Sequence, residues 1–217
     1  MSTAGATFQR LIDKVIGNLE PNCYAYLDDI CIVSETFEQH LKLLREVIQR
    51  IINANLTVNR EKSVFCAQEV KYLGFVINYE GLKVDPEKTR AVKEYPKPRT
   101  VKQLRRYVGM LSWYRRSIKD FAKIAEPLIR LTRKDEKFKW EKEQDEAFEK
   151  LKELLLGAPT LHRPVTDAEY FVHTDACDTG LGAMITQKID GVERVIAFAS
   201  RALHKNERNF STTEKNV

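Results

Sequence analysis

The sequence predicts an α+β protein in which a helical segment separates two β-rich segments. Three observations carry this prediction. Short runs of β-forming residues alternate with amphipathic helices before residue 94. Residues 100–156 show helical periodicity only, and residues 168–202 return to strand patterns. We therefore expect three domain-like segments, with the boundaries 1–93, 94–160 and 161–217.

A tight β-hairpin is expected near the start of the chain. Two β-rich runs, residues 22–27 and 30–34, leave only the doublet Asp28-Asp29 between them. A two-residue connection of this kind is typical of a hairpin. Apolar residues at helical spacing predict a short helix over residues 6–19, just before the hairpin.

A second helix is expected over residues 36–54. Thr36 and Gln39 form a capping-box pattern ahead of an apolar stripe, which is typical of a helix start. A turn is expected over residues 78–81. Further short strands are expected at residues 56–58, 63–67 and 71–78.

The middle of the chain is expected to be helical after a linker. Two prolines mark residues 94–100 as the linker, because each disfavours helix just before it. Thr100 and Gln103 repeat the capping-box pattern at the start of an amphipathic helix. Pro127 is expected to begin a second short helix. A third is expected over residues 142–156, where a following glycine stops it.

The last part is expected to be a three-stranded antiparallel meander. Its strands are residues 169–176, 180–189 and 192–202, and Asp190-Gly191 is a hairpin turn between the last two. A sheet of three strands with nothing to cover its face is marginal. The sequence therefore looks cut off inside a domain.

Composition excludes several classes of protein. Of the 217 residues, 43% are hydrophobic, and no run approaches the roughly 18 apolar residues of a membrane helix. The first ten residues lack the pattern of a signal peptide. Four cysteines without C-x-x-C spacing argue against a structural zinc site and a disulfide framework. We therefore expect a cytoplasmic or nuclear location and no membrane partner.

Charge is unevenly distributed along the chain. Residues 83–134 contain 16 Lys and Arg but 5 Asp and Glu, a net charge of +11, whereas the whole chain carries +5. One interpretation is an ordinary solvated helical surface. The other is a surface that follows the phosphate backbone of a nucleic acid.

The doublet Asp28-Asp29 also has two interpretations. Adjacent aspartates at a hairpin tip are usually ordinary turn residues. Here apolar and aromatic strands flank them, so the carboxylates would project from a buried framework. Mg²⁺ prefers carboxylate oxygens, and a polymerase holds two divalent ions a few ångströms apart. The doublet could supply part of such a site, with a third carboxylate from elsewhere.

The doublet and its surroundings resemble a known family. Tyr26-Leu27-Asp28-Asp29 resembles the Y-x-D-D box of reverse transcriptases. The blocks around it resemble, in order, the Pol polyproteins of gypsy-type LTR retrotransposons, which are related to retroviruses. These blocks are GATFQRLID, HLKLLREVIQRIINANLTVNREKSVF, VKYLGFVINYEGLKVDPEK, LRRYVGMLSWYRRSIKDFAKIAEPLIRLTRKDEKFKW and FVHTDACDTGLGAMITQ. The resemblance implies a partial polymerase palm, a helical thumb and an incomplete RNase H-like sheet.

The resemblance implies a role for each matching residue. Asp28 and Asp29 would be catalytic ligands of Mg²⁺ or Mn²⁺ in the polymerase site, and Asp175 would be one in the RNase H site. Implied contacts to the nucleotide or the primer involve Phe8, Gln9, Tyr26, Lys62, Leu73, Gly74 and Phe75. Implied contacts to phosphates involve Arg99, Lys102, Arg105, Arg106, Arg115 and Arg116. The implied partners are an RNA/DNA template–primer duplex, deoxynucleoside triphosphates and the remainder of the Pol polyprotein.

The resemblance also implies that Lys62 would donate a proton to departing pyrophosphate. For other residues, a structural explanation competes with the implied role. Leu73 and Phe75 fit a plain core hairpin almost equally well. Trp113 and Tyr114, next to the implied phosphate contacts, are more typical of packing than of base stacking.

The sequence departs from the family in ways that bear on activity. The first polymerase aspartate of the family belongs upstream of GATFQ, and the later RNase H carboxylates belong after the last residue. Asn216 stands where the family usually has a glutamate, and a helix would turn Glu214 to the opposite face. We therefore expect a polymerase fragment that is inactive alone. The alternatives are a non-catalytic nucleic-acid-binding remnant and a decayed retrotransposon reading frame.

Overall fold

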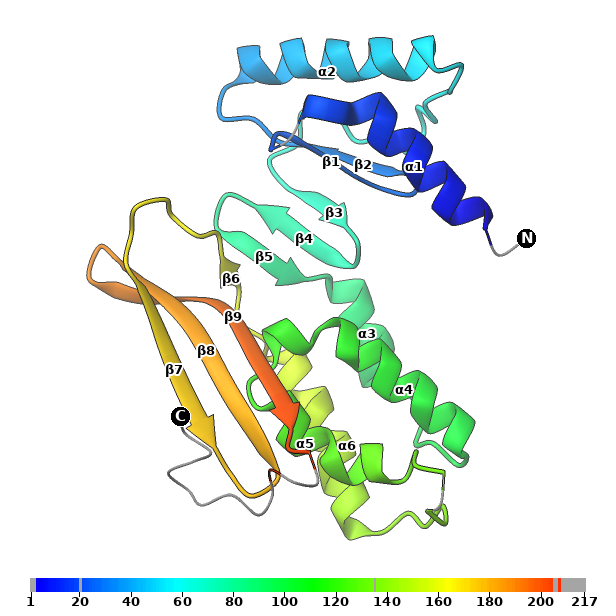
Figure 1. Cartoon of the computed structure of the whole chain (residues 1–217), viewed down its shortest axis with the longest axis vertical. Coiled ribbons are helices and arrows are strands. Elements are labelled where there is room, and N and C mark those ends of the chain that lie inside the picture. Colours follow the sequence, from blue (N-terminus) through cyan, green and yellow to red (C-terminus); the bar gives the residue numbers. More distant parts are fainter. Residues whose placement is uncertain (1–2, 20, 135, 205–206, 208–217) are drawn as a thin grey trace. The chain divides into compact units, whose positions relative to one another are not determined.

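The protein is described by a computed structural model that covers residues 3–19, 21–134, 136–204 and 207 (Figure 1). It divides into two compact units, Met1–Tyr72 and Leu73–Val217. Helices combine with antiparallel sheets, so the predicted α+β class is confirmed. None of the described helices is both long and apolar enough to cross a membrane.

The first unit is a β-hairpin with two helices packed on it (Figure 1). Its buried core joins the helices to the first strand through Ile12, Ile16, Cys23, Val47 and Ile51. The elements are α1 (Ala4–Ile16), η1 (Gly17–Leu19), β1 (Cys23–Tyr26), β2 (Asp29–Ile32), α2 (Phe37–Asn53) and β3 (Val70–Tyr72).

The helix predictions for this unit are confirmed. Helix α1 with the 3-10 turn after it covers the predicted range 6–19. Helix α2 begins at a complete capping box. The Thr36 hydroxyl accepts a hydrogen bond from the Gln39 backbone N–H, and the Gln39 side chain accepts one from the Thr36 N–H.

The strands predicted at 56–58 and 63–67 are wrong. Those residues are irregular, because Asn59 organises a turn between them. The Asn59 side chain accepts hydrogen bonds from the backbone N–H groups of Glu61 and Lys62. A side chain that bonds to the backbone two residues on is typical of a turn and competes with strand pairing.

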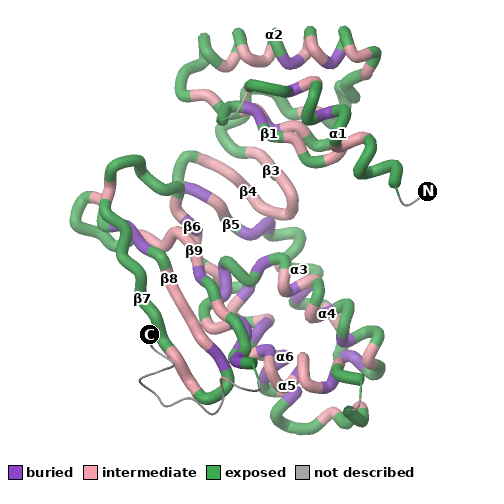
Figure 2. The backbone as a smooth tube through the Cα atoms, in the orientation of Figure 1, coloured by how far each residue is buried: buried purple, intermediate pink, exposed green. Residues whose placement is uncertain are grey.

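The second unit packs helices against a three-stranded sheet. Figure 2 shows buried stretches recurring along α4, α5 and α6, whose side chains form most of its core. The helices are α3 (Pro86–Lys93), α4 (Val101–Trp113), η2 (Arg115–Ser117), α5 (Phe121–Arg130) and α6 (Lys142–Leu156). The strands are β4 (Phe75–Asn78), β5 (Gly81–Val84), β6 (Leu161–His162), β7 (Tyr170–Ala176), β8 (Gly180–Ile189) and β9 (Val192–Ala202).

The C-terminal meander is confirmed. Strands β7, β8 and β9 pair antiparallel in that order, and Asp190 and Gly191 both adopt positive φ, as a two-residue hairpin turn requires. Helix α5 lies against β9, where the Ala122 N–H donates to the Ser200 hydroxyl. Asn216 and Glu214 lie outside the described residues.

Two other predictions for this unit are wrong. Pro127 lies inside α5 and does not begin a helix, because the buried stripe from Phe121 to Leu128 carries the helical period through it. The single strand predicted at 71–78 is broken at Leu73 and Gly74, which have φ of 51° and 83° and reverse the chain. Short helix α3 was not predicted, although Asp85-Pro86 is a typical start, with Asp85 as N-cap.

Candidate functional site

The β1–β2 hairpin places the aspartate doublet at its tip. Tyr26 pairs with Asp29, so the connecting residues are Leu27 and Asp28, one residue earlier than predicted. Asp28 is therefore at the turn itself, and Asp29 is the first residue of β2. Both side chains are exposed at the end of strands whose inward residues are buried.

Gln9 from α1 holds this turn. Its Oε1 accepts a hydrogen bond of 2.6 Å from the Leu27 N–H, and its Nε2 donates to the Ala25 carbonyl at 3.2 Å. Nε2 also donates to Asp13 at 2.8 Å. Leu27 has φ of 53°, an uncommon conformation for a residue with a branched side chain. One amide thus fixes both sides of a strained turn next to Asp28.

A cleft of about 530 Å³ lies beside the hairpin, within the first unit. It brings together four residues that the sequence singled out: Phe8, Asp28, Asp29 and Lys62. The Lys62 backbone is held in the turn organised by Asn59. Two carboxylates and an ammonium group thus line one concave surface. Gln9 and Tyr26 are not among the lining residues, and Tyr26 is exposed on β1.

The hairpin strands beneath the carboxylates carry two buried thiols, Cys23 and Cys31. Burial raises the pKa of the Cys23 thiol to about 11, with neighbouring Cys31 adding to the shift, so this thiol is neutral at pH 7. Burial also raises the pKa of the Tyr72 hydroxyl, and the charge of Asp29 contributes. The carboxylates therefore lie at the end of strands with buried, uncharged side chains, beside a cleft that Lys62 and Lys71 also line.

The donor set of the hairpin fits part of a magnesium site. Asp28 and Asp29 offer adjacent carboxylate oxygens, which Mg²⁺ prefers, and their exposure leaves room for the water ligands that Mg²⁺ retains. Across the described residues, no group of three or more His, Cys, Asp or Glu side chains could hold a metal ion. The doublet by itself is thus an incomplete set of ligands.

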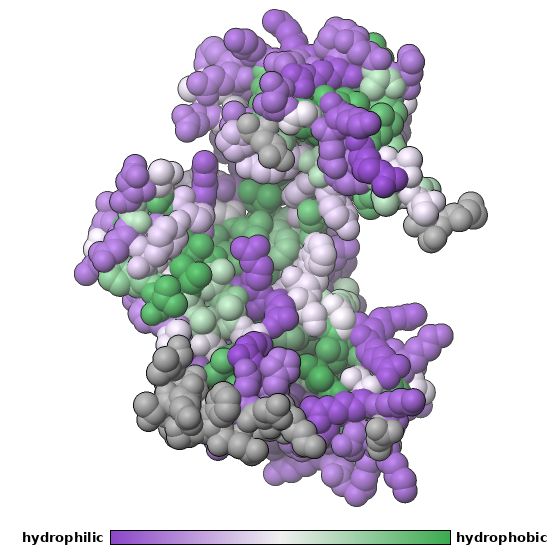
Figure 3. Space-filling model, in the orientation of Figure 1, coloured by the Kyte–Doolittle hydropathy of each residue, from purple (hydrophilic) through white to green (hydrophobic). Residues whose placement is uncertain are grey.

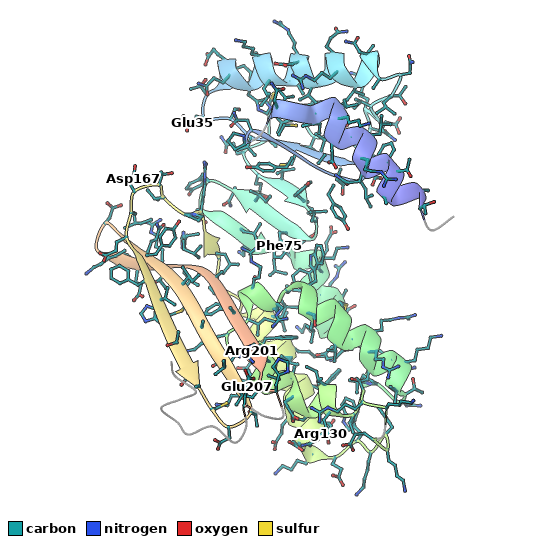
Figure 4. The ribbon with its side chains drawn as sticks, viewed as in Figure 1. Glu35, Phe75, Arg130, Asp167, Arg201 and Glu207 are labelled. Atoms are coloured by element: carbon teal, nitrogen blue, oxygen red, sulfur yellow. The ribbon has the colours of Figure 1, made fainter. Side chains whose placement is uncertain are left out.

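The residues Leu73, Gly74 and Phe75 form a turn and the start of β4 in the second unit. Strand β4 pairs with β5, and the Asp85 N–H donates to the Gly74 carbonyl at 3.1 Å. Phe75, labelled in Figure 4, contacts the ring of Tyr114 edge-on at 5.3 Å between centroids. Tyr114 is buried, so the packing interpretation fits this aromatic residue.

The predicted phosphate-binding residues lie before, along and after α4, and all are exposed. Figure 3 shows hydrophilic side chains gathered over this helix. Two of the arginines also have internal partners. Arg105 donates to the Thr132 carbonyl at 2.7 Å, and Arg115 donates to the Ser200 carbonyl. The exposed set is Arg99, Lys102, Arg105, Arg106, Arg115 and Arg116.

Asp175 lies on β7, exposed and paired in register with Gly182 of β8. Two positions earlier, His173 contacts Glu193 at 2.7 Å, and the Thr186 hydroxyl donates to the same carboxylate at 2.6 Å. The hydroxyl bond, followed by His173, holds the pKa of Glu193 below its ordinary value. His173 on β7 thus contacts a side chain of β9 in the same sheet, which fits a strand residue.

Sequence reasoning missed two supporting groups at the site. Asp13 lies one helical turn after Gln9 and accepts from its amide, a spacing of four residues that the sequence does show. The Trp113 indole donates to the Leu73 carbonyl at 2.9 Å, a contact between residues 40 positions apart that no local pattern reveals.

Two known protein families match separate parts of the chain. The family described as "Reverse transcriptase (RNA-dependent DNA polymerase)" matches residues 1–77. The family described as "RNase H-like domain found in reverse transcriptase" matches residues 140–217. Reverse transcriptase and RNase H-like families generally use divalent metals.

Curated relatives match along the whole chain. The Pol polyprotein from transposon opus of Drosophila melanogaster, described as retrovirus-related, is 39% identical over 229 residues. The chain belongs to the retrovirus-related Pol polyproteins. The corresponding polyprotein from transposon gypsy is 33% identical over 230 residues. Both alignments cover all of this chain and about a fifth of the relative, at 23% and 22% of its length.

A solved structure shares the fold. This is the foamy viral protease-reverse transcriptase in complex with an RNA/DNA hybrid, at 28% identity and a TM-score of 0.81. The alignment covers 98% of this chain and 29% of that one. The curated relatives and the solved structure therefore agree on the reverse transcriptase family, and the solved structure shares the α+β fold.

Proposed function

We propose that this chain is the part of an RNA-directed DNA polymerase that carries its Y-x-D-D hairpin, its thumb and the start of its RNase H domain. The observation that carries the proposal is the cleft lined by Asp28, Asp29, Phe8 and Lys62, beside a hairpin tip fixed by Gln9. Such pre-organisation is what metal-dependent nucleotidyl transfer requires of its ligands.

In this proposal Asp28 and Asp29 hold divalent cations, Mg²⁺ or Mn²⁺, with a third carboxylate from another part of the Pol polyprotein. When bound, the cations neutralise charge on the triphosphate and activate the primer hydroxyl. Phe8 and Gln9 would lie beneath the nascent base pair, and Tyr26 would lie near the primer end or the incoming deoxynucleoside triphosphate. Lys62 donates a proton to pyrophosphate. Asp175 has the corresponding ligand role in the RNase H-like domain.

The metal assignment is tested on the chain itself. Mn²⁺ is expected to broaden NMR signals selectively around residues 26–30, because a paramagnetic ion relaxes nearby nuclei. The double variant Asp28→Asn and Asp29→Asn should lose this broadening. A matched control, Asp167→Asn, changes an exposed carboxylate in the other unit and should leave it intact. Equal broadening in all three proteins would refute the metal site.

A second candidate function is nucleic-acid binding without catalysis by the isolated chain. The exposed basic residues on and around α4 favour it, as does the incomplete set of metal ligands among the described residues. Primer extension with Mg²⁺ or Mn²⁺ separates the two functions. We expect duplex binding but no extension above an Asp28→Asn control, and extension above that control would show that the chain is active alone.

A further inference from the structure

Residues at the C-terminal end of α4 contact the turn at Leu73 and Gly74. The Trp113 indole N–H donates to the Leu73 carbonyl at 2.9 Å. Helix α4 ends at Trp113, and the next residue, Tyr114, is its C-cap. Two consecutive aromatic residues at one helix end therefore contact the same turn.

The fit between Tyr114 and Gly74 is tight. A Cβ added to Gly74 would lie 2.7 Å from the Tyr114 hydroxyl oxygen, closer than real Cβ contacts. Gly74 also has φ of 83°, which favours glycine. Tyr114 is buried and contacts Phe75 through its ring, so it has little freedom to move away. The site thus requires glycine for two separate reasons.

The contact of Trp113 is of a different kind. Its side chain is 50% exposed, so the ring is not part of the core, yet its single polar group is used on a backbone carbonyl of the turn. Because the indole is half exposed, burial of its ring contributes little to stability here. The hydrogen bond fixes a residue with φ of 51°, a conformation that costs free energy for leucine.

We infer that Trp113 and Tyr114 are positioning residues, which hold the Leu73–Gly74 turn in the conformation that it presents to a primer end. This inference rests on the proposed function, in which residues 73–75 place the primer terminus. It adds a link within the second unit, because α4 also carries Lys102, Arg105 and Arg106. The helix that contacts phosphates would thereby also set the turn.

The chain offers a matched pair of variants, since it contains two tryptophans. Trp113→Phe keeps an aromatic ring and removes one N–H. Trp140→Phe makes the same change where the indole donates to Asp145 at 2.7 Å, away from the turn. The amide of Asp85 donates to the Gly74 carbonyl, so its hydrogen exchange reports on the turn.

The first measurement uses the free chain. Trp113→Phe should speed exchange of the Asp85 amide by about 2- to 10-fold, the factor expected for loss of one ordinary hydrogen bond. Trp140→Phe should not change it. Gly74→Ala should speed exchange more, and adding Tyr114→Phe should partly restore it by removing the hydroxyl that the new methyl group meets. Equal exchange in wild type and Trp113→Phe would overturn the inference.

The second measurement adds a template–primer duplex with 2-aminopurine at the primer 3′ end. At saturating protein, Trp113→Phe should change the 2-aminopurine fluorescence relative to wild type, while affinity for an internally labelled duplex matches that of Trp140→Phe. An unchanged terminal signal would overturn the positioning role even if exchange is faster. Absence of duplex binding by wild type would refute the proposed function and, with it, primer positioning. The exchange measurement needs no duplex, so it still shows whether Trp113 holds the turn.

Discussion

Replacing Gln9 with alanine is expected to loosen the tip of the β1–β2 hairpin by about 1 to 3 kcal/mol. The magnitude follows from two part-buried hydrogen bonds, one from the Leu27 N–H and one to the Ala25 carbonyl. Each contributes roughly 0.5 to 1.5 kcal/mol net. The third bond, to Asp13, is exposed and adds little.

Hydrogen exchange of the Leu27 amide measures this opening directly, because that N–H donates to Gln9. A loss of 1 to 3 kcal/mol corresponds to exchange that is about 5- to 150-fold faster, at about 1.4 kcal/mol per tenfold. Gln9→Glu keeps an acceptor for the Leu27 N–H but places a carboxylate oxygen against the Ala25 carbonyl and the Asp13 carboxylate, so it should also speed exchange.

Gln49→Ala is the matched control. Its amide donates to Asn53 on the exposed side of α2, within the same unit, so the Leu27 amide should exchange at the wild-type rate. If Gln9→Ala also leaves that rate unchanged, then Gln9 does not hold the turn, and the pre-organisation of Asp28 loses its physical basis.

Three further predictions concern the second unit. Arg106→Gln should reduce the salt dependence of duplex binding by about one phosphate contact. Arg105→Gln should reduce it less, because the Arg105 guanidinium also bonds to a backbone carbonyl. Fluorescence anisotropy over a salt series measures both changes. The Glu193 carboxyl has a folded-state pKa below its ordinary 4.5, so its contribution to stability is present above pH 4.5 and is lost as pH falls through the folded pKa. The thermal unfolding midpoint should therefore fall more steeply with acid in wild type than in Glu193→Gln, and parallel curves would contradict this. Leu104→Ala removes a fully buried side chain and should cost about 2 to 5 kcal/mol in urea unfolding, with a cost below 1 kcal/mol arguing against this core.

Local chemistry made much of the fold predictable. The capping box at Thr36 and the Asp190-Gly191 turn each specify their structure within a few residues, and both are confirmed. The aspartate hairpin was predicted, but its turn was placed one residue late. Register is decided by pairing between strands, and Leu27 at a positive φ is a conformation that residue type does not suggest.

The errors share a physical cause. Residues 56–67 contain enough β-forming side chains to suggest strands, but the side chain of Asn59 takes the backbone bonds that a strand would need. Pro127 suggests a helix start when read alone, and only the packing of α5 shows otherwise. At the candidate site, the residue types were visible in the sequence, whereas the bonds made by Gln9 and Trp113 depend on tertiary contacts.

The proposed function requires that this chain binds a template–primer duplex, and a titration measures that binding. The 217-residue chain is titrated against a labelled RNA/DNA hybrid by fluorescence anisotropy, from low to moderate salt. We expect the logarithm of the association constant to fall linearly with the logarithm of salt concentration. The slope should be shallower when Lys102 and Arg106 are both changed to glutamine. Affinity that is absent, or that is unaffected by both salt and the double variant, would contradict the proposed function.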